Sequence, residues 1–349
     1  MIPQNPKIDY ASFEMRKVDH IHLAQNPQNQ ADNMNYLDQL RFLHEAIPDF
    51  DFEDISLVSR RLGQEVSTPF FVSSMTAGHI KSQDINRNLI EACAATGWAM
   101  GVGSQRRELS DTDAGQEWQS LRRAFPDVVL LSNIGITQII HTSTTQIQKL
   151  IESLQATALI VHCNPLQEVI QPEGTPQFKG AWQALERLVR ELPVPIIVKE
   201  TGCGFSAKTM TRLRDCGVSV IDVSGLGGTH WGRIEGHRAS ENSMQQQAAL
   251  VFQNWGITSI ESLQYARSFP HTLELWGSGG VRHGLDAAKL LALGATSIGF
   301  AKPLLEAALQ SSQSVYEKMK AIEFELRIAL FCTGSREISA LGAALCPSV

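Results

Sequence analysis

The sequence predicts a (β/α)8 barrel, an α/β fold in which eight parallel strands alternate with helices. From residue 69 onward, short apolar runs alternate with helical patterns, as is typical of parallel strands buried on both faces. There are eight such runs, and polar or ionisable residues follow each of them, as expected where strand ends form a functional rim. No GxGxxG motif follows the first run, which disfavours an open doubly wound sheet.

The predicted elements follow one another in a regular order. The expected strands are Pro69–Ser74, Trp98–Gly103, Val128–Asn133, Ala158–His162, Pro195–Lys199, Val220–Val223, Thr272–Gly277 and Ser297–Phe300. The clearest helical patterns between them are Ile85–Ala95, Trp182–Glu191, Lys208–Asp215 and Asp286–Leu293, and a glycine ends several of these. We expect one domain: an N-terminal extension and lid (1–65), the barrel (66–302) and a helical tail (303–349) with an amphipathic helix over 315–331.

Composition excludes several classes of protein. Thirty Lys+Arg against 36 Asp+Glu give a net charge of −6, which argues against a general nucleic-acid or membrane-surface binder. No apolar run approaches the roughly 20 residues of a transmembrane helix, and the acidic N-terminal segment does not resemble a signal peptide. Six cysteines without a CxxC pair indicate a reducing compartment. We therefore expect a cytoplasmic protein whose partners are small molecules.

A glycine-rich turn, GSGGVR, follows the seventh predicted strand and contains Gly279, Gly280 and Arg282. Glycines let successive backbone N–H groups converge on an anion, and the loops after the last two strands are the usual phosphate site of such barrels. Ala301 and Lys302 follow the eighth strand. A tight turn that needs positive φ is the alternative explanation of the glycines. We favour phosphate, which points to a nucleotide-like cofactor such as FMN.

Lys199 ends the fifth predicted strand, where a buried ammonium group needs a partner. Pairing with Glu200 or Asp222 would satisfy it. Alternatively, Lys199 reaches the N1/O2 edge of a flavin and stabilises its reduced anion. The spacing alone favours neither interpretation.

The run after the fourth strand, HxNxxQE, is the richest in functional groups. It places the side chains of His162, Asn164, Gln167 and Glu168 within seven residues. A carboxylate such as Glu168 suits Mg²⁺ bridged to substrate phosphates, and His162 with Asn164 suits a diphosphate. Taken singly, His162 is more often a structural histidine and Glu168 a solvated charge.

Basic residues elsewhere strengthen the case for an anionic substrate. Arg16 and Lys17 lie in the N-terminal extension, and Arg106 follows the second strand. Adjacent basic residues in such a segment are ordinarily a solvated face. If the extension folds over the rim as a lid, however, Arg16 and Lys17 would close on the anion.

Together the motifs resemble the type 2 isopentenyl diphosphate isomerase family, in family order across nearly the whole chain. The matching segments are RKVDHI (16–21), SMTAG (74–78), GSQR (103–106), HCNPLQEVIQPEG (162–174), VKETGCG (198–204), DVSGLGGTHWGRIE (222–235), GSGGVRHGLDAAKLLALGA (277–295) and TGSREI (333–338). The glycine-rich pieces would fit many flavin barrels, whereas RKxDH, HxNxxQE and GGTxWxxIE together are far more specific.

The resemblance implies an FMN-binding barrel that needs Mg²⁺ and a reductant such as NADPH, interconverts isopentenyl and dimethylallyl diphosphate, and forms a homotetramer or homooctamer. It implies a substrate site in which the diphosphate is held by Arg16, Lys17, Arg106, His162 and Asn164, and in which Gln167 approaches the isoprene end. It implies an FMN site made of Ser74, Met75, Thr76, Ser104, Asn133, Lys199, Ser224, Thr229, Gly279, Gly280, Arg282, Ala301 and Lys302. Glu168 would carry Mg²⁺, and the catalytic residues would be Gln167, Lys199 and Glu235.

Three positions qualify this expectation. Ala77 stands where the family's MTGG has its first glycine, which puts a methyl group near the flavin. Thr175 stands where the family's PEGD has its acid, which removes an acceptor near the Gln167–Glu168 loop. Glu235 equally suits a structural ion pair with Arg233 or Arg238.

Two other functions are weighed from the residues. One is an FMN-dependent dehydrogenase or oxidase of a small anionic substrate. Related hydroxy-acid oxidases read SNHGGR after the sixth strand, with the histidine as base, whereas this chain has Leu226 there and His230 four residues later. The other is a non-catalytic binding barrel, which predicts loss of the ionisable rim that this chain keeps.

Overall fold

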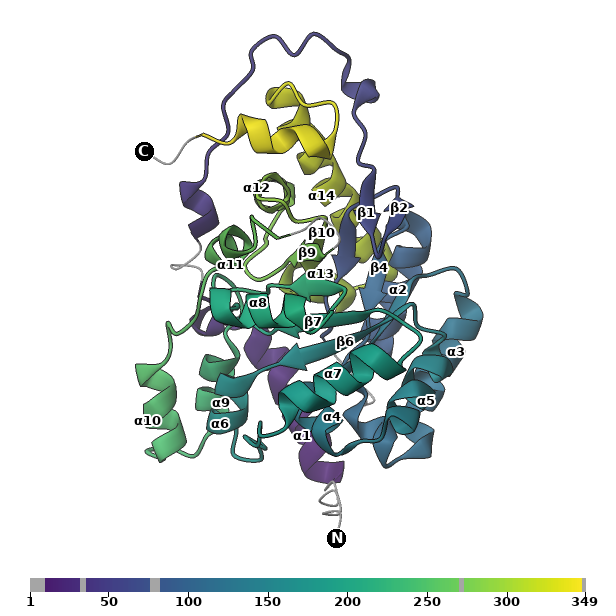
Figure 1. Cartoon of the computed structure of the whole chain (residues 1–349), viewed down its shortest axis with the longest axis vertical. Helices are drawn as coiled ribbons and strands as arrows, with labels where there is room; N and C mark the ends of the chain where they lie inside the picture. The colour runs from purple at the N-terminus through teal and green to yellow at the C-terminus, as the bar shows by residue number, and fades with distance from the viewer. Residues whose placement is uncertain (1–9, 32–35, 76–81, 270–272, 347–349) are drawn as a thin grey trace.

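Eight parallel strands close into a barrel in the order β10-β3-β4-β5-β6-β7-β8-β9 (Figure 1). The computed structural model describes residues 10–31, 36–75, 82–269 and 273–346. The barrel strands are β3 (Phe70–Val72), β4 (Ala99–Gly101), β5 (Leu130–Gly135), β6 (Ala158–Cys163), β7 (Ile196–Glu200), β8 (Val220–Asp222), β9 (Glu274–Gly277) and β10 (Ser297–Phe300). Each overlaps one predicted run, so the predicted (β/α)8 barrel is confirmed.

The apolar runs form strands here because both of their faces are buried. Alternate side chains of a strand point to opposite faces. Phe71, Leu131 and Trp276 pack in one cluster with other strand residues. Phe70 and Leu130, each next to one of these, instead pack in the larger cluster together with the helices. A continuous apolar run is therefore the pattern that this barrel requires.

Helices cover the outside of the barrel. They are α2 (Ser82–Thr96), α3 (Gln116–Ala124), α4 (Ile136–His141), α5 (Thr144–Leu154), α6 (Pro165–Ile170), α7 (Ala181–Glu191), α8 (Ala207–Asp215), α9 (Trp231–Arg238), α10 (Met244–Val251), α11 (Ser259–Tyr265), α12 (Gly284–Ala292), α13 (Lys302–Ala308) and α14 (Ser312–Cys332). The five predicted helices correspond to α2, α7, α8, α12 and α14. Ser143, Ser206 and Thr258 cap three helices by accepting a backbone N–H. Of the helices in the described part of the chain, none is long and apolar enough to cross a membrane.

The N-terminal extension contains a hairpin and a helix that have no counterpart among the predicted elements. The hairpin of β1 (Ser59–Arg61) and β2 (Gln64–Val66) lies at the N-terminal ends of the strands, where the backbone N–H groups of Leu62 and Gly63 donate to the Glu274 carboxylate (2.9 and 2.6 Å). Helix α1 (Tyr10–Gln25) packs against α9 and α13. This helix therefore lies over the opposite, functional end of the barrel.

Candidate active site

Two adjoining cavities open at the C-terminal ends of the strands, under α1. The larger has a volume of about 410 Å³ and the smaller about 130 Å³. Side chains that line both cavities mark their junction: Lys17, His20, Ser74, Met75, Lys199, Thr201 and Trp231. Helix α1, in the predicted N-terminal extension, supplies Lys17 and His20 to the shared wall.

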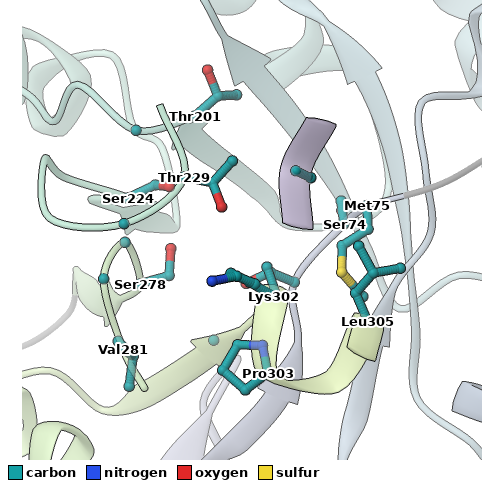
Figure 2. A pocket seen from close by; sticks show the side chains of 18 of the residues that line it. Ser74, Met75, Thr201, Ser224, Thr229, Ser278, Val281, Lys302, Pro303 and Leu305 are labelled. Atoms are coloured by element: carbon teal, nitrogen blue, oxygen red, sulfur yellow. The ribbon is translucent and has the colours of Figure 1, made fainter. Parts of the chain in front are cut away.

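Loops that follow β8, β9 and β10 form most of the larger cavity. In Figure 2, Thr229, Ser278 and Lys302 extend into the space, across from Met75 and Leu305. Gly279 and Gly280 have φ values of +88° and +76°, a conformation that favours glycine. A Cβ atom at Gly228 would lie 2.7 Å from the backbone nitrogen of Gly280. The glycines therefore let two loops approach closely, and both bring backbone groups to the cavity wall.

The larger cavity fits a flavin mononucleotide. The hydroxyls of Ser73 and Ser74 are buried at its wall and have no hydrogen-bond partner among the described residues. Buried polar atoms without a partner are rare and usually indicate a missing ligand or water. The close glycine loops beside Ala301 and Lys302 are the kind of backbone cradle that takes a phosphate group. Thr76, a predicted FMN contact, lies outside the described residues, as does Ala77.

Lys199 projects from the end of β7 into the junction. Its Nζ lies 3.3 Å from the Asp222 carboxylate and donates to the backbone oxygen of Glu200 (3.0 Å) and to Ser278 Oγ (3.3 Å). Of the two carboxylates considered from the sequence, Asp222 is therefore the charge partner. Because Lys199 also lines both cavities, its ammonium group is fixed at the place where a flavin ring would meet the smaller cavity.

The smaller cavity is strongly cationic. Arg16 and Lys17 come from α1, and Arg106 from the loop after β4. Burial, followed by the charge of Arg16, lowers the pKa of Lys17 to about 7. Burial also lowers the pKa of Arg16. Because burial disfavours the charged forms, an anionic ligand in this cavity would favour them again.

His162 and Asn133 form a fixed pair on the floor of the smaller cavity. Asn133 donates its amide to the Val102 carbonyl (3.1 Å), so its Oδ1 accepts from Nδ1–H of His162 (2.9 Å). Burial, together with Lys17, Lys199 and Arg106, lowers the pKa of His162 to about 3. The ring is therefore neutral in the free protein.

Glu168 is held in place by its own loop. Asn164 donates to Oε1 (3.1 Å), and both the backbone N–H and the hydroxyl of Thr175 donate to Oε2 (2.6 and 3.3 Å). Thr175 therefore contacts the predicted metal ligand directly, as a donor. Within the described residues, no three His, Cys, Asp or Glu side chains form a metal-binding group. A Mg²⁺ ion on Glu168 fits only if substrate oxygens or water complete its coordination.

Glu235, predicted to be catalytic, is fully buried behind the wall. It is absent from the described residues that line either cavity. Its Oε1 accepts from Gln167 (2.9 Å) and lies 2.9 Å from His20 Nε2, and its Oε2 accepts from Arg238 (2.5 Å). Arg238 is thus its ion-pair partner. Arg233 instead donates to the backbone oxygens of Gln30 and Gln253.

The predicted residues divide between the cavities. Only the larger is lined by Ser224, Thr229, Gly279, Gly280, Arg282, Ala301 and Lys302. Only the smaller is lined by Arg16, Ser104, Arg106, Asn133, His162, Asn164, Gln167 and Glu168. Ser104 and Asn133 were predicted to contact FMN, but they line the smaller cavity together with the residues predicted to bind the diphosphate. Arg282 lines the larger cavity, but its guanidinium group pairs with Asp38 and Asp286.

Several lining residues are absent from the predicted site, among them His20, Trp231 and Gln30. His20 lies in the RKVDHI motif and Trp231 in the GGTHWGRIE motif, so the motifs could have identified both as site residues. Gln30 lies in the extension, where it accepts from Thr229 (3.0 Å), and no motif marks it.

The oxidase alternative lacks its base. Leu226 is buried at the position where the oxidases have histidine. His230 is turned away: its ring caps α9 by accepting from the Arg233 backbone N–H (3.3 Å) and contacts the Trp255 carbonyl (3.1 Å). Among described residues, neither cavity wall includes His230.

Comparison with known proteins finds a flavin-dependent family and relatives that are named as isomerases. The family model for FMN-dependent dehydrogenases matches residues 134–347. An isopentenyl-diphosphate delta-isomerase of Legionella pneumophila (strain Corby) is 58% identical over 339 residues, covering 97% of this chain and 99% of its own. One of Bdellovibrio bacteriovorus is 48% identical over 335 residues, covering 95% of this chain and 96% of its own.

Solved structures share the fold at low identity. A flavocytochrome b2 double mutant with sulfite bound gives a TM-score of 0.67 at 18% identity, covering 95% of this chain and 82% of that chain. A mandelate oxidase mutant with a monooxide FMN adduct gives 0.61 at 14%, covering 97% of this chain and 96% of that chain. At such identities the likeness concerns the barrel alone.

Proposed function

The chain belongs to the FMN-dependent isopentenyl-diphosphate delta-isomerase family, and we propose that it interconverts isopentenyl and dimethylallyl diphosphate at the junction of its two cavities. The observation that carries the proposal is this junction itself. A cavity that fits a flavin meets a cationic cavity that fits a diphosphate, and seven side chains, Lys199 among them, line both.

The reaction moves a C=C bond by one position without net oxidation or reduction. When bound, reduced FMN supplies the acid that protonates the weakly basic alkene and an electron-rich ring beside the developing positive charge. Lys199 would stabilise the anionic reduced form, because Asp222 holds its ammonium group at the junction. This arrangement provides charges fixed before the substrate arrives.

The cationic cavity orients the substrate. Arg16, Lys17 and Arg106 surround a space suited to the diphosphate, and charge-assisted hydrogen bonds to phosphate are strong. Gln167 lines this cavity next to Glu168, so its amide would face the substrate while Glu168 binds Mg²⁺ through the diphosphate oxygens. Helix α1 lines both cavities, and it would help to keep water from the bound substrate.

The reductant, the compartment and the assembly complete the proposal. NADPH would prime the flavin without being consumed in step with product, and the enzyme would act in the cytoplasm. It would form a homotetramer or homooctamer. Exposed apolar side chains around α10, namely Met244, Val251 and Trp255, support self-association, which light scattering would measure.

The test is an anaerobic assay with FMN, Mg²⁺, NADPH and isopentenyl diphosphate. We expect dimethylallyl diphosphate to accumulate far in excess of the NADPH oxidised. NADPH oxidation equal to product formation would contradict the proposal. Oxidation of 2-hydroxy acids by the same preparation would favour the oxidase alternative.

A further inference from the structure

His20 lies on α1 at the junction of the two cavities. It lines both, and only 8% of its surface is exposed. Its ring meets Trp231, which also lines both cavities, edge to face at 5.0 Å. A substrate with its diphosphate in the smaller cavity and its alkene toward the larger one must pass this pair.

Glu235 fixes His20 from behind. The carboxylate has no exposed surface, and its Oε1 lies 2.9 Å from His20 Nε2. Burial alone would raise the pKa of Glu235, but its contacts with His20, Gln167 and Arg238 bring it down to about 2. A permanently ionised carboxylate receives Nε2–H, which leaves Nδ1 as the ring nitrogen able to accept a proton.

We propose that His20 is the base that takes up the allylic proton of the substrate, and that Glu235 is its positioning residue. The inference rests on the proposed isomerisation. The C–H bond at the carbon between the alkene and the CH₂O group breaks, and its electron pair becomes the new C=C bond. The proton passes to Nδ1 of His20, while the terminal carbon gains the proton that the reduced cofactor donates. The reverse direction returns both protons.

The other ionisable groups at the junction are less suited to this role. Lys199 is a paired ammonium group, and Lys17 lies beside Arg16 and Arg106 in the cationic cavity. His20 is buried, which lowers its pKa, and the charges of Lys17 and Arg238 act in the same direction. The hydrogen bond to Glu235 opposes them. The ring is therefore neutral at rest, and the carboxylate behind it stabilises the imidazolium once formed, as in a catalytic triad.

The test compares His20→Gln and Glu235→Gln with the matched control His22→Gln. His22 lies two residues further along α1 and is exposed. Loss of a general base costs roughly 10²- to 10⁴-fold in rate. We expect that loss in kcat for His20→Gln, with KM changed less than about threefold and FMN affinity retained, and no change for His22→Gln. Retained FMN affinity shows that the variants fold.

Two further measurements distinguish a general base at His20 from a residue with a purely structural role. In the wild type, kcat should fall at acidic pH as His20 becomes protonated, and His20→Gln should lose that acid limb. Glu235→Gln should move it to lower pH, because the carboxylate favours the imidazolium. The double variant should be no slower than His20→Gln, since both side chains act as one unit.

A His20→Gln variant that keeps wild-type kcat, or one whose defect is entirely in KM, would overturn the inference. An unmoved acid limb in Glu235→Gln would overturn the role of Glu235. Failure of the proposed function is distinguishable, because it would appear as a wild-type enzyme that forms no dimethylallyl diphosphate.

Discussion

The two cavities differ in what builds them. The larger is formed mainly by strand ends, close glycine loops and buried hydroxyls of the barrel, and α1 lines one side of it. The smaller is the more cationic of the two, and two of its basic side chains, Arg16 and Lys17, come from α1, outside the barrel. Flavin proteins with 14–18% identity share this barrel architecture. Under the proposed function, the barrel would supply most of the cofactor site, and α1 would add two basic side chains to the site of the anionic substrate.

Lys199→Met should have the largest effect, because Lys199 belongs to both cavities. The substitution leaves Asp222 buried without its charge partner, which costs roughly 3–5 kcal/mol of unfolding free energy. Flavin-dependent activity should be lost as well. Urea denaturation measures the first effect and the isomerase assay the second.

Adding Asp222→Asn to Lys199→Met provides the control. It removes the unpaired charge, so it should restore most of the stability but none of the activity. If Lys199→Met were as stable and as active as the wild type, the junction would not depend on this pair.

Gly280→Ala should affect the larger cavity alone. The residue has φ of +76°, and a Cβ atom would lie 2.6 Å from the Gly227 carbonyl oxygen. Strain of this kind costs roughly 1–3 kcal/mol, so FMN affinity should fall about 10- to 100-fold in a fluorescence titration. Gly294→Ala is the matched control: φ is +101°, but open space surrounds the Cβ position. Equal FMN affinity in both variants would argue against the phosphate cradle.

Arg16→Gln should affect the smaller cavity alone. Hydrogen bonds to charged groups contribute roughly 1.5–3 kcal/mol, so KM for isopentenyl diphosphate should rise about tenfold or more, with FMN affinity unchanged. Arg214→Gln, which removes an exposed pair with Asp215, is the control. An unchanged KM in Arg16→Gln would mean that α1 does not close on the diphosphate.

The uptake of protons when a diphosphate binds should be the smallest of the predicted effects. Lys17, with a pKa of about 7, is partly neutral in the free protein, and His162, with a pKa of about 3, is fully neutral. A bound diphosphate favours their charged forms, so the complex holds more protons than the free protein. Affinity should therefore decline as pH rises through about 7.

Calorimetry with inorganic diphosphate in buffers of different ionisation enthalpy measures this uptake. The Lys17→Gln variant should show less of it. Identical binding heats in all buffers would indicate that neither group changes its protonation state.

The sequence predicts the barrel well because buried parallel strands leave a clear pattern. Runs such as Ala158–His162 are apolar throughout, and a helix pattern with a glycine stop follows several of them. The β1–β2 hairpin escaped prediction because Ser59–Arg61 and Gln64–Val66 are short and polar. Their pairing depends on Glu274, which is distant in sequence.

The site was predictable as a set of residues but not as two cavities. Motif order identified Arg16, His162 and Glu235, yet no periodicity indicates that Glu235 lies behind His20 and away from the substrate. Likewise the sequence does not indicate that Asn133 orients His162. Such relations depend on which side chains a closed barrel and a helix outside it bring together.

The most direct test of the central claim replaces the cofactor while leaving the cavity unchanged. The apoprotein is loaded with reduced 5-deaza-FMN, which has the shape and phosphate of FMN but carbon in place of the N5 nitrogen. We expect it to bind with an affinity close to that of FMN and to support no isomerisation of isopentenyl diphosphate. Turnover equal to that of the FMN-loaded enzyme would contradict a reduced flavin that serves as the proton donor at the junction.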